Sequence, residues 1–126
     1  MFEELEKVYE TMMGDLKIKA EATIMSALQK VFEGDNPPYC ISWTQYAPYF
    51  NDGDECVFGV NDIEVFLTEE DFDEYDYSDR DNPVVGELYN FSRSELGEQI
   101  FKSVFGNHSK VVVTKDGFEV EEYDHD

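Results

Sequence analysis

The chain of 126 residues carries 30 acidic side chains against nine basic ones, which gives a formal net charge of -21. This length fits a single domain, 1-126, and a content of 41% hydrophobic and 15% aromatic residues is too apolar for a disordered acidic tail. A negative potential of this size repels nucleic acid and anionic membranes and attracts basic protein surfaces. Direct binding to DNA, RNA or a membrane is therefore disfavoured.

No apolar stretch approaches the roughly 18 residues needed to cross a bilayer, and the first ten residues lack the basic and apolar regions of a signal peptide. A soluble, cytoplasmic protein is expected. Cys40 and Cys56 have no CxxC spacing, which argues against a zinc site or a disulfide scaffold. Two buried free thiols are predicted, with a bridge between them conceivable only under oxidising conditions.

The first predicted element is a helix over Phe2 to Phe32, either continuous or broken near Gly14, because apolar side chains recur there every three or four residues. Gly34 and the Pro37-Pro38 pair stop the helix after Glu33. We expect its apolar stripe to pack on a sheet rather than in a coiled-coil dimer, because the stripe includes small and irregular residues. The stripe comprises Leu5, Tyr9, Met12, Leu16, Ala20, Ile24, Leu28 and Val31.

Two antiparallel strands are predicted next, over Ile41 to Phe50 and Cys56 to Leu67, because both segments are rich in β-branched and aromatic residues. The turn-forming run Asn51 to Asp54 separates them. Alternate residues from Val57 to Leu67 would share one face, and Asn61-Asp62 marks a bulge or a break into two strands.

Ser92, three residues before Glu95, predicts a capping-box helix that runs to Gly106-Asn107. Lys110 to Thr114 and Phe118 to Tyr123 flank an Asp-Gly pair, which predicts a C-terminal hairpin. Because strands and helices are segregated along the chain, the predicted fold class is α+β. We expect an antiparallel sheet with the long N-terminal helix and a second, shorter helix packed on one face.

The segment from Glu69 to Asp81 holds eight carboxylates and one arginine, a net charge of -7 in 13 residues, with aromatic rings set between the charges. Exposed rings gain nothing from water, so this combination predicts a surface that contacts a partner. If the segment is extended, alternate carboxylates would lie about 6.6 Å apart, similar to successive phosphates of a nucleic-acid strand. The predicted partner-binding residues here are Glu69, Glu70, Asp71, Asp73, Glu74, Tyr75, Asp76, Tyr77, Asp79 and Asp81. Phe72 could serve as a further aromatic anchor.

A second acidic ridge is predicted in the last strand, where Glu119 and Glu121 share one parity and Glu122 lies on the other. Glu119, Glu121 and Glu122 are included in the predicted partner-binding surface. Charge would steer the encounter and fix specificity, while the tyrosine rings would supply most of the affinity.

The stretch ISWTQYAPYFNDGDECVFGVNDI, from Ile41 to Ile63, resembles a Trp-Thr-Gln-Tyr…Pro-Tyr-Phe-Asn-Asp-Gly-Asp motif of small acidic phage and bacterial proteins. The resemblance covers about one fifth of the chain and implies a phage gene as the source, without implying a particular chemistry. Trp43, Tyr46, Tyr49 and Phe50 are expected to provide ring packing, with a ligand pocket as the alternative.

Neither a metal site nor an enzyme is indicated. An EF-hand loop that began at Asp71 would place Tyr75, Asp76 and Asn82 at positions five, six and twelve, where an acid, a glycine and a glutamate belong. His108 and His125 fall in a loop and at the terminus, so neither is expected to be a fixed ligand or base. Nucleophile, phosphate-loop and zinc-protease motifs are lacking, so a non-enzymatic protein without cofactor or metal is predicted.

These expectations combine into one functional hypothesis: a small phage-encoded inhibitor in the host cytoplasm, of an anti-defence type. By DNA or RNA mimicry it would bind a basic host protein such as a nuclease, a CRISPR effector or a polymerase. Two alternatives remain open. One is an immunity protein or antitoxin that neutralises a basic toxin, and the other is a virion structural or assembly protein that self-associates through the Phe2 to Phe32 helix.

Overall fold

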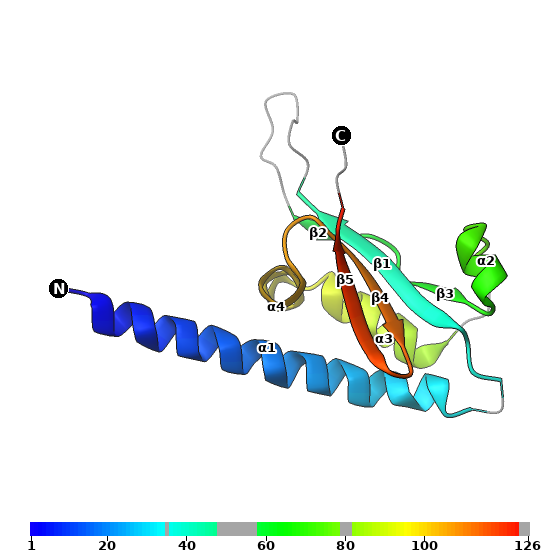
Figure 1. Cartoon of the computed structure of the whole chain (residues 1–126), viewed down its shortest axis with the longest axis horizontal. Coiled ribbons are helices and arrows are strands. Elements are labelled where there is room, and N and C mark those ends of the chain that lie inside the picture. Colours follow the sequence, from blue (N-terminus) through cyan, green and yellow to red (C-terminus); the bar gives the residue numbers. More distant parts are fainter. Residues whose placement is uncertain (35, 48–57, 79–81, 124–126) are drawn as a thin grey trace, which may run out of the picture.

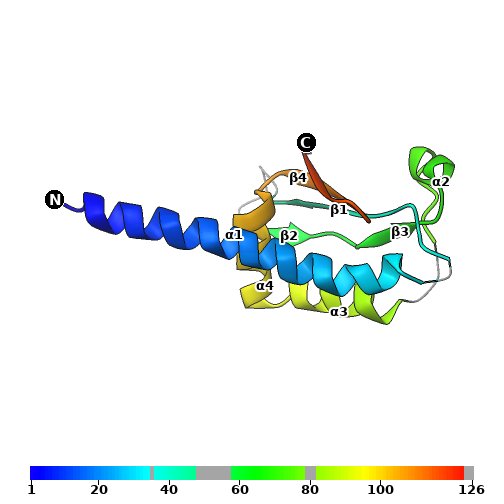
Figure 2. The ribbon, with the colours of Figure 1, turned by 60° about the horizontal axis from the view of Figure 1, so that its bottom comes forward.

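A computed structural model describes residues 1–34, 36–47, 58–78 and 82–123. They form two layers, a five-stranded antiparallel sheet and a layer of helices against one of its faces (Figures 1 and 2). The predicted α+β class is confirmed, although the covered face carries two shorter helices, α3 and α4, beside α1. The elements are α1 (Glu3–Phe32), β1 (Cys40–Tyr46), β2 (Gly59–Val60), β3 (Glu64–Phe66), α2 (Glu69–Asp73), α3 (Pro83–Ser92), α4 (Glu95–Phe105), β4 (Ser109–Thr114) and β5 (Gly117–Glu122).

The sheet is built around β1, which pairs with β4 on one side and with both β2 and β3 on the other. The break predicted at Asn61-Asp62 is confirmed, because these residues separate β2 from β3. The prediction that alternate residues from Val57 to Leu67 share one face of the sheet is wrong. Ile63 and Val65 pack against the main core, whereas the Asn61 side chain bonds Thr44 on the opposite face of the sheet.

The core lies between the sheet and the helices. Alternate side chains of a strand point to opposite faces, so Ile41 and Trp43 of β1 both point towards the helices and are buried. The Trp43 ring lies 5.6 Å from the ring of Phe101 and 5.5 Å from that of Phe105, both on α4. This aromatic cluster fixes α4 against the centre of the sheet.

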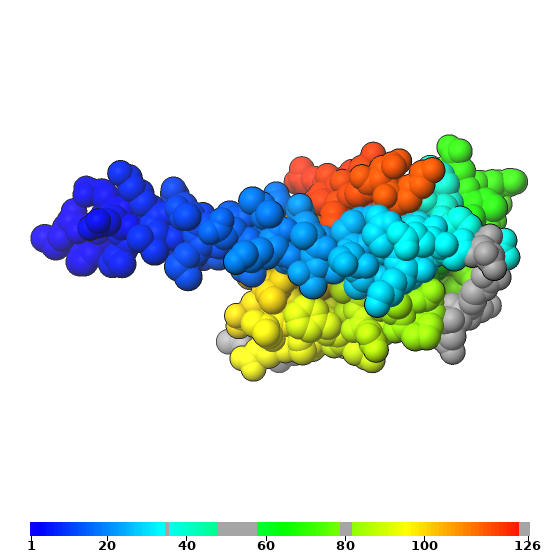
Figure 3. All heavy atoms as spheres, turned by 90° about the horizontal axis from the view of Figure 1, so that it is seen from below, coloured from blue at the N-terminus to red at the C-terminus, as the bar shows by residue number. Residues whose placement is uncertain are grey.

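Helix α1 runs unbroken through Gly14 and ends at Phe32 with Glu33 as its C-cap, so the predicted boundary is confirmed. Only its C-terminal half packs on the domain, through Ile24, Leu28 and Phe32. The expectation that the whole apolar stripe packs on the sheet is wrong. A 30-residue helix is about 45 Å long, whereas strands of six or seven residues span only about 20 Å, so the N-terminal half projects beyond the body (Figures 1 and 3).

Helix α3 was not predicted, because an Asn-Pro pair is typical of a turn and a proline inside a segment argues against a helix there. Pro83 is instead the first helical residue, where its missing N–H costs nothing, and Asn82 caps the helix by accepting hydrogen bonds from Val84 and Val85 N–H. The capping box predicted at Ser92 is also wrong. Ser92 ends α3, and Ser94 caps α4 by accepting from Gly97 N–H at 3.0 Å.

The C-terminal hairpin is confirmed. Thr114 pairs with Gly117 across a two-residue turn formed by Lys115 and Asp116, and β5 is an edge strand of the sheet. The glycine predicted to end the preceding helix, Gly106, is its C-cap at a φ of 99°, a conformation that favours glycine.

Candidate functional site: an acidic groove on the open face of the sheet

The sheet face turned away from α1, α3 and α4, which we call the open face, has α2 at one end (Figure 1). Because Ile41, Trp43, Val111 and Val113 point into the core, their strand neighbours point to this face. Strand registers continue the alternation into β5, since Val111 pairs with Val120 and Val113 with Phe118. The side chains assigned in this way to the open face include Ser42, Thr44, Tyr46, Glu64, Phe66, Lys110, Val112, Glu119, Glu121 and Tyr123.

Helix α2 covers one end of the open face. Thr68 begins it by accepting a hydrogen bond from Asp71 N–H at 3.0 Å. Phe72 then packs edge-on against Phe66 with ring centroids 5.2 Å apart. Phe72 thereby extends a small second core of Cys40, Phe66 and Val112.

Cys40 in this second core is a buried free thiol, as predicted, and burial raises its pKa to about 11, which keeps it protonated and unreactive. Cys56 lies outside the described residues, as do Tyr49, Phe50, the Asn51 to Asp54 turn and His125. His108 lies in the loop before β4, as predicted, and is half-buried.

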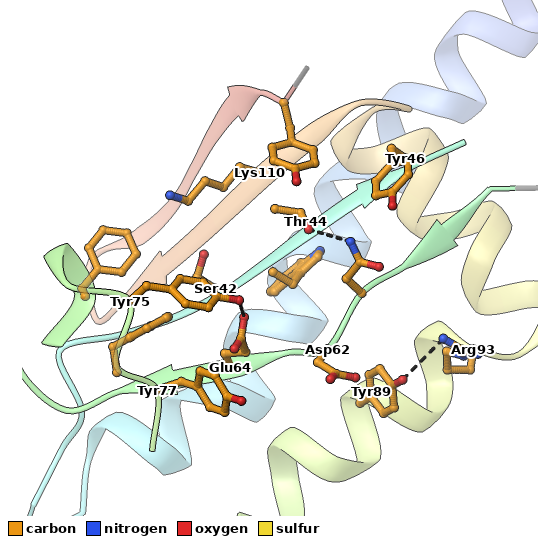
Figure 4. A pocket seen from close by; sticks show the side chains of 15 residues that line it. Ser42, Thr44, Tyr46, Asp62, Glu64, Tyr75, Tyr77, Tyr89, Arg93 and Lys110 are labelled. Carbon is orange, nitrogen blue, oxygen red and sulfur yellow. Dashed lines mark hydrogen bonds between the residues drawn. The ribbon is translucent and has the colours of Figure 1, made fainter. Parts of the chain in front are cut away.

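Beside α2 the open face is hollowed into a groove of about 660 Å³ (Figure 4). We call it the acidic groove. Tyrosine rings line it from four segments of the chain, and Asp62 and Glu64 bring carboxylates into it. The residues that line it are Ser42, Trp43, Thr44, Tyr46, Asn61, Asp62, Glu64, Phe66, Phe72, Tyr75, Tyr77, Tyr89, Arg93, Lys110 and Tyr123.

Tyr75 connects α2 to the floor of the groove. Its hydroxyl donates a 2.5 Å hydrogen bond to the Glu64 carboxylate, and its ring lies 5.9 Å from that of Tyr77 (Figure 4). The backbone of Tyr75 has a φ of 56°, a left-handed conformation that non-glycine residues adopt only with strain. Hydrogen bonding to Glu64 is the main cause that raises the pKa of Tyr75 to about 12, followed by burial.

We expect replacement of Glu64 by glutamine to lower the pKa of Tyr75 from about 12 towards its ordinary value of 10.0. Since the pKa is higher in the folded chain, the contact stabilises the fold below pH 10 and loses this effect as the pH rises through 12. Titration of tyrosinate absorbance measures the shift, and Tyr75→Phe identifies which of the eight tyrosines moves. A tyrosine that still titrates near 12 in Tyr75→Phe would contradict this assignment.

The acidic residues of the rim converge from α2 and from β5. The pKa of exposed Tyr39, which precedes β1, is raised first by the Glu69 carboxylate and then, after burial and Cys40, by Asp73 and Glu119. One tyrosine hydroxyl thus lies within the fields of both acidic segments. Asp62 and Glu64 line the groove. We call its rim the acids of α2 and of the segment after it together with those of β5 on the open face, which are Glu69, Glu70, Asp71, Asp73, Glu74, Asp76, Glu119 and Glu121.

Few cations offset this charge. In the groove, Lys110 Nζ lies 5.0 Å from the Phe72 ring centroid and the Arg93 guanidinium lies 5.7 Å from that of Tyr89. Within residues 1–34, 36–47, 58–78 and 82–123, the only ion pair joins the Met1 amine to Glu3 at 3.4 Å. The carboxylates of the groove are therefore not neutralised by ion pairs within the described part of the chain.

The structure brings together most of the predicted partner-binding residues, but not in the predicted form. The segment from Glu69 to Asp73 is helical, so the extended ladder of carboxylates is wrong. Tyr75 and Tyr77 are exposed, as the prediction requires. Glu119 and Glu121 lie on the open face, whereas Glu122 points to the other face, because it pairs with inward-facing Ser109. Asp79 and Asp81 are outside the described residues.

Several groove residues were not predicted. Tyr89 lies on the unforeseen helix α3 and Arg93 is its C-cap, and Glu64 was not singled out. The alternation of core and polar residues along Cys40–Tyr46 is the signal that could have placed Thr44 and Tyr46 on one face.

Comparisons of the chain with protein-family models, with curated proteins and with solved structures gave no match. Among the described residues, no helix has the length and apolarity needed to cross a membrane. Nor does this part of the chain gather three or more His, Cys, Asp or Glu side chains in an arrangement suited to a metal ion. The acidic groove is the feature from which a function can be argued.

Proposed function

We propose that the chain is a non-enzymatic inhibitor that binds the basic surface of a nucleic-acid-handling protein and blocks its DNA or RNA channel. The observation that supports this most is the acidic groove, where carboxylates that form no ion pair with another described residue lie beside exposed tyrosine rings. The same face would suit an immunity protein that neutralises a basic toxin, and a toxin gene next to this one would favour that alternative.

The carboxylates and aromatic rings of the groove suit the arginine and lysine side chains of a partner. A guanidinium or ammonium that enters would meet both a carboxylate and the face of a ring, and cation–π contact adds about 0.5–2 kcal/mol as the pair loses water. Lys110 over Phe72 is an internal example of this contact. Carboxylates on the rim would accelerate encounter, while Tyr75 and Tyr77 would provide the apolar contact area on which affinity depends.

Mimicry of nucleic acid would here depend on charge density rather than on strand-like spacing. Residues of α2 follow one another at about 1.5 Å along the helix axis, which concentrates their carboxylates at one end of the groove. Those of β5 add a second line of charge along the edge of the sheet. A basic channel that accommodates a polyanion could accept this arrangement without matching individual phosphates.

We expect the double variant Asp73→Lys/Glu119→Lys to bind a basic partner at least about tenfold more weakly. Its control is Glu33→Lys/Glu87→Lys, which makes the same change in net charge at exposed positions of the helical layer. Both variants are titrated into a panel of purified nucleases, CRISPR effectors and polymerases at low and high salt. Binding should be inhibitory, sensitive to salt and retained by the control.

Equal loss of binding in both double variants would show that net charge alone is responsible, and would contradict a role for the groove. Failure of the unmodified chain to bind any basic protein of the panel at low salt would overturn the proposal itself. Circular dichroism of each variant checks that folding is intact, which we expect because exposed carboxylates contribute little to stability.

A further inference from the structure

The N-terminal half of α1 projects from the body (Figure 3). Its apolar side chains are exposed there. Leu5, Tyr9 and Met12 are 65%, 64% and 63% exposed, although each has a side chain that gains from burial. A single helix of this length is only marginally stable in water, because most helical stability in proteins comes from packing of an amphipathic face. A covering partner would therefore stabilise this segment.

Spacing along the helix changes where the body begins. From Leu5 to Leu16 the stripe residues follow gaps of four, three and four, and the N-cap residue Phe2 lies three residues before Leu5. The average gap is 3.5, which is typical of coiled coils. From Leu16 to Leu28 the gaps are all four, and this is the part that packs on α3 and α4. The projecting half therefore carries an apolar face suited to packing against another long helix. We call this face the seam and define it as Phe2, Leu5, Tyr9, Met12 and Leu16.

We propose that two copies of this chain associate through this seam, with their α1 helices antiparallel. In that orientation Leu5 of one copy would face Leu16 of the other, and Tyr9 would face Met12, so each layer pairs two large apolar side chains. Phe2 would face Lys19, whose ammonium can lie over the ring. The two Leu5–Leu16 pairs and the two Tyr9–Met12 pairs would form four central layers. All of these residues lie on the projecting half.

The length of the projection agrees with this register. Phe2 of the second copy would reach Lys19, and the next residue, Ala20, is the first of the stripe that packs against the core. The overlap thus ends where the body begins, and the two bodies lie at opposite ends of the paired helices. A parallel pair would instead place both bodies at the same end.

Charge favours the same orientation. Glu3, Glu4 and Glu6 make the start of α1 acidic, while Lys17 and Lys19 outnumber Asp15 and leave the end of the projecting half net positive. An antiparallel pair brings each acidic end near a basic one, whereas a parallel pair would gather the acidic ends of both copies. Proximity of opposite charges is favourable and depends on salt.

The buried area would suffice for a specific dimer of modest affinity. The seam residues, with the neighbouring Val8 and Met13, would bury about 600 Å² on each copy, or about 1,200 Å² in total, at the lower end of stable interfaces. The opposite face of the helix is polar apart from Ile18. No second seam of comparable area therefore lies on the projecting half.

Light scattering and sedimentation of the full chain test the proposal, with a mass of twice 14.6 kDa expected. Met12→Glu should weaken the dimer by about tenfold or more. Its control, Ile18→Glu, makes the same change at a residue that is equally exposed on the other face and should leave the dimer intact. A monomer at all concentrations, or equal weakening by both changes, would overturn the proposal.

Cross-linking tests the orientation. In a Cys56→Ser chain, Leu5→Cys and Leu16→Cys are made as separate variants. Antiparallel pairing predicts that only their mixture forms an intermolecular disulfide, because a disulfide requires Cα atoms within about 7 Å. Cross-linking of either variant with itself would indicate a parallel pair and would overturn the proposed orientation. Loss of the dimer would leave the groove proposal unaffected, because the two surfaces share no residue.

Discussion

Replacement of Gly97 by alanine is expected to destabilise the fold by about 3 kcal/mol or more, because the new methyl group has no space. A Cβ atom at this position would lie 1.7 Å from the carbonyl oxygen of Phe91 and 2.7 Å from its carbonyl carbon. That oxygen also accepts hydrogen bonds from the Ser94 N–H at 3.0 Å and the Ser94 hydroxyl at 2.6 Å. The turn between α3 and α4 would have to open to admit the methyl group.

Gly86 on α3 is the matched control for this substitution. A Cβ atom there would meet nothing within 4 Å, so Gly86→Ala should be neutral or should stabilise the helix by up to about 1 kcal/mol. Urea unfolding followed by the fluorescence of Trp43, the only tryptophan, measures both changes. A Gly97→Ala chain as stable as the unmodified protein would show that the α3–α4 turn is loosely packed.

The parts of the fold that the sequence predicts correctly have local signals. Helix α1 follows from its apolar spacing and from the Gly and Pro residues behind it, and the last hairpin follows from Asp116-Gly117. Each signal lies within the element that it specifies. The tertiary contacts of these elements are compatible with what the local sequence specifies. The α+β class follows from the order of the elements along the chain.

Two errors have one physical cause, which is that residues act differently at helix ends than elsewhere. Pro83 interrupts a helix interior but suits the first helical position, so the Asn82-Pro83 pair begins α3 instead of separating two segments. Similarly, carboxylates that would repel in an extended strand are favourable in the first turn of α2, where the helix dipole is positive and Thr68 supplies the cap.

The acidic groove could be predicted only in part. Its rim was foreseen because the carboxylates of α2 and the tyrosines that follow are neighbours in sequence. Its floor was not, because Tyr46, Glu64 and Tyr89 come together only through strand pairing and the packing of α3. The spatial convergence of distant segments is a property of the fold, and no local pattern records it.

The limits of the apolar stripe on α1 show the same distinction. Its spacing is visible in the sequence, but the point at which the body ends depends on how far the sheet extends. Ile24 and Leu28 are buried and Leu5 and Tyr9 are exposed, although all four lie on the stripe that predicts a helix. A pattern of apolar residues therefore identifies a face that needs a partner without identifying that partner.

Gln45 illustrates a third kind of feature that a sequence does not show, a buried polar side chain that joins two layers. It is completely buried on the core side of β1. Its oxygen accepts a hydrogen bond from Trp43 Nε1 at 3.0 Å, and its amide nitrogen donates to the carbonyl oxygens of Phe101 and Gly106 at 2.9 and 2.6 Å. One amide thus attaches the C-terminal end of α4 to the middle of the sheet.

Replacement of Gln45 by leucine should cost about 3–5 kcal/mol of unfolding free energy, because the Trp43 N–H and the carbonyls of Phe101 and Gly106 lose a partner that water cannot readily replace. Thr44→Val is the control on the same strand. It removes a hydrogen bond to Asn61 at the surface and should cost about 1 kcal/mol or less. Urea unfolding followed by circular dichroism compares the two, and hydrogen exchange should show α4 opening first in the leucine variant. Equal stability of the two variants would mean that the buried amide contributes no more than a surface hydrogen bond, contrary to its three contacts.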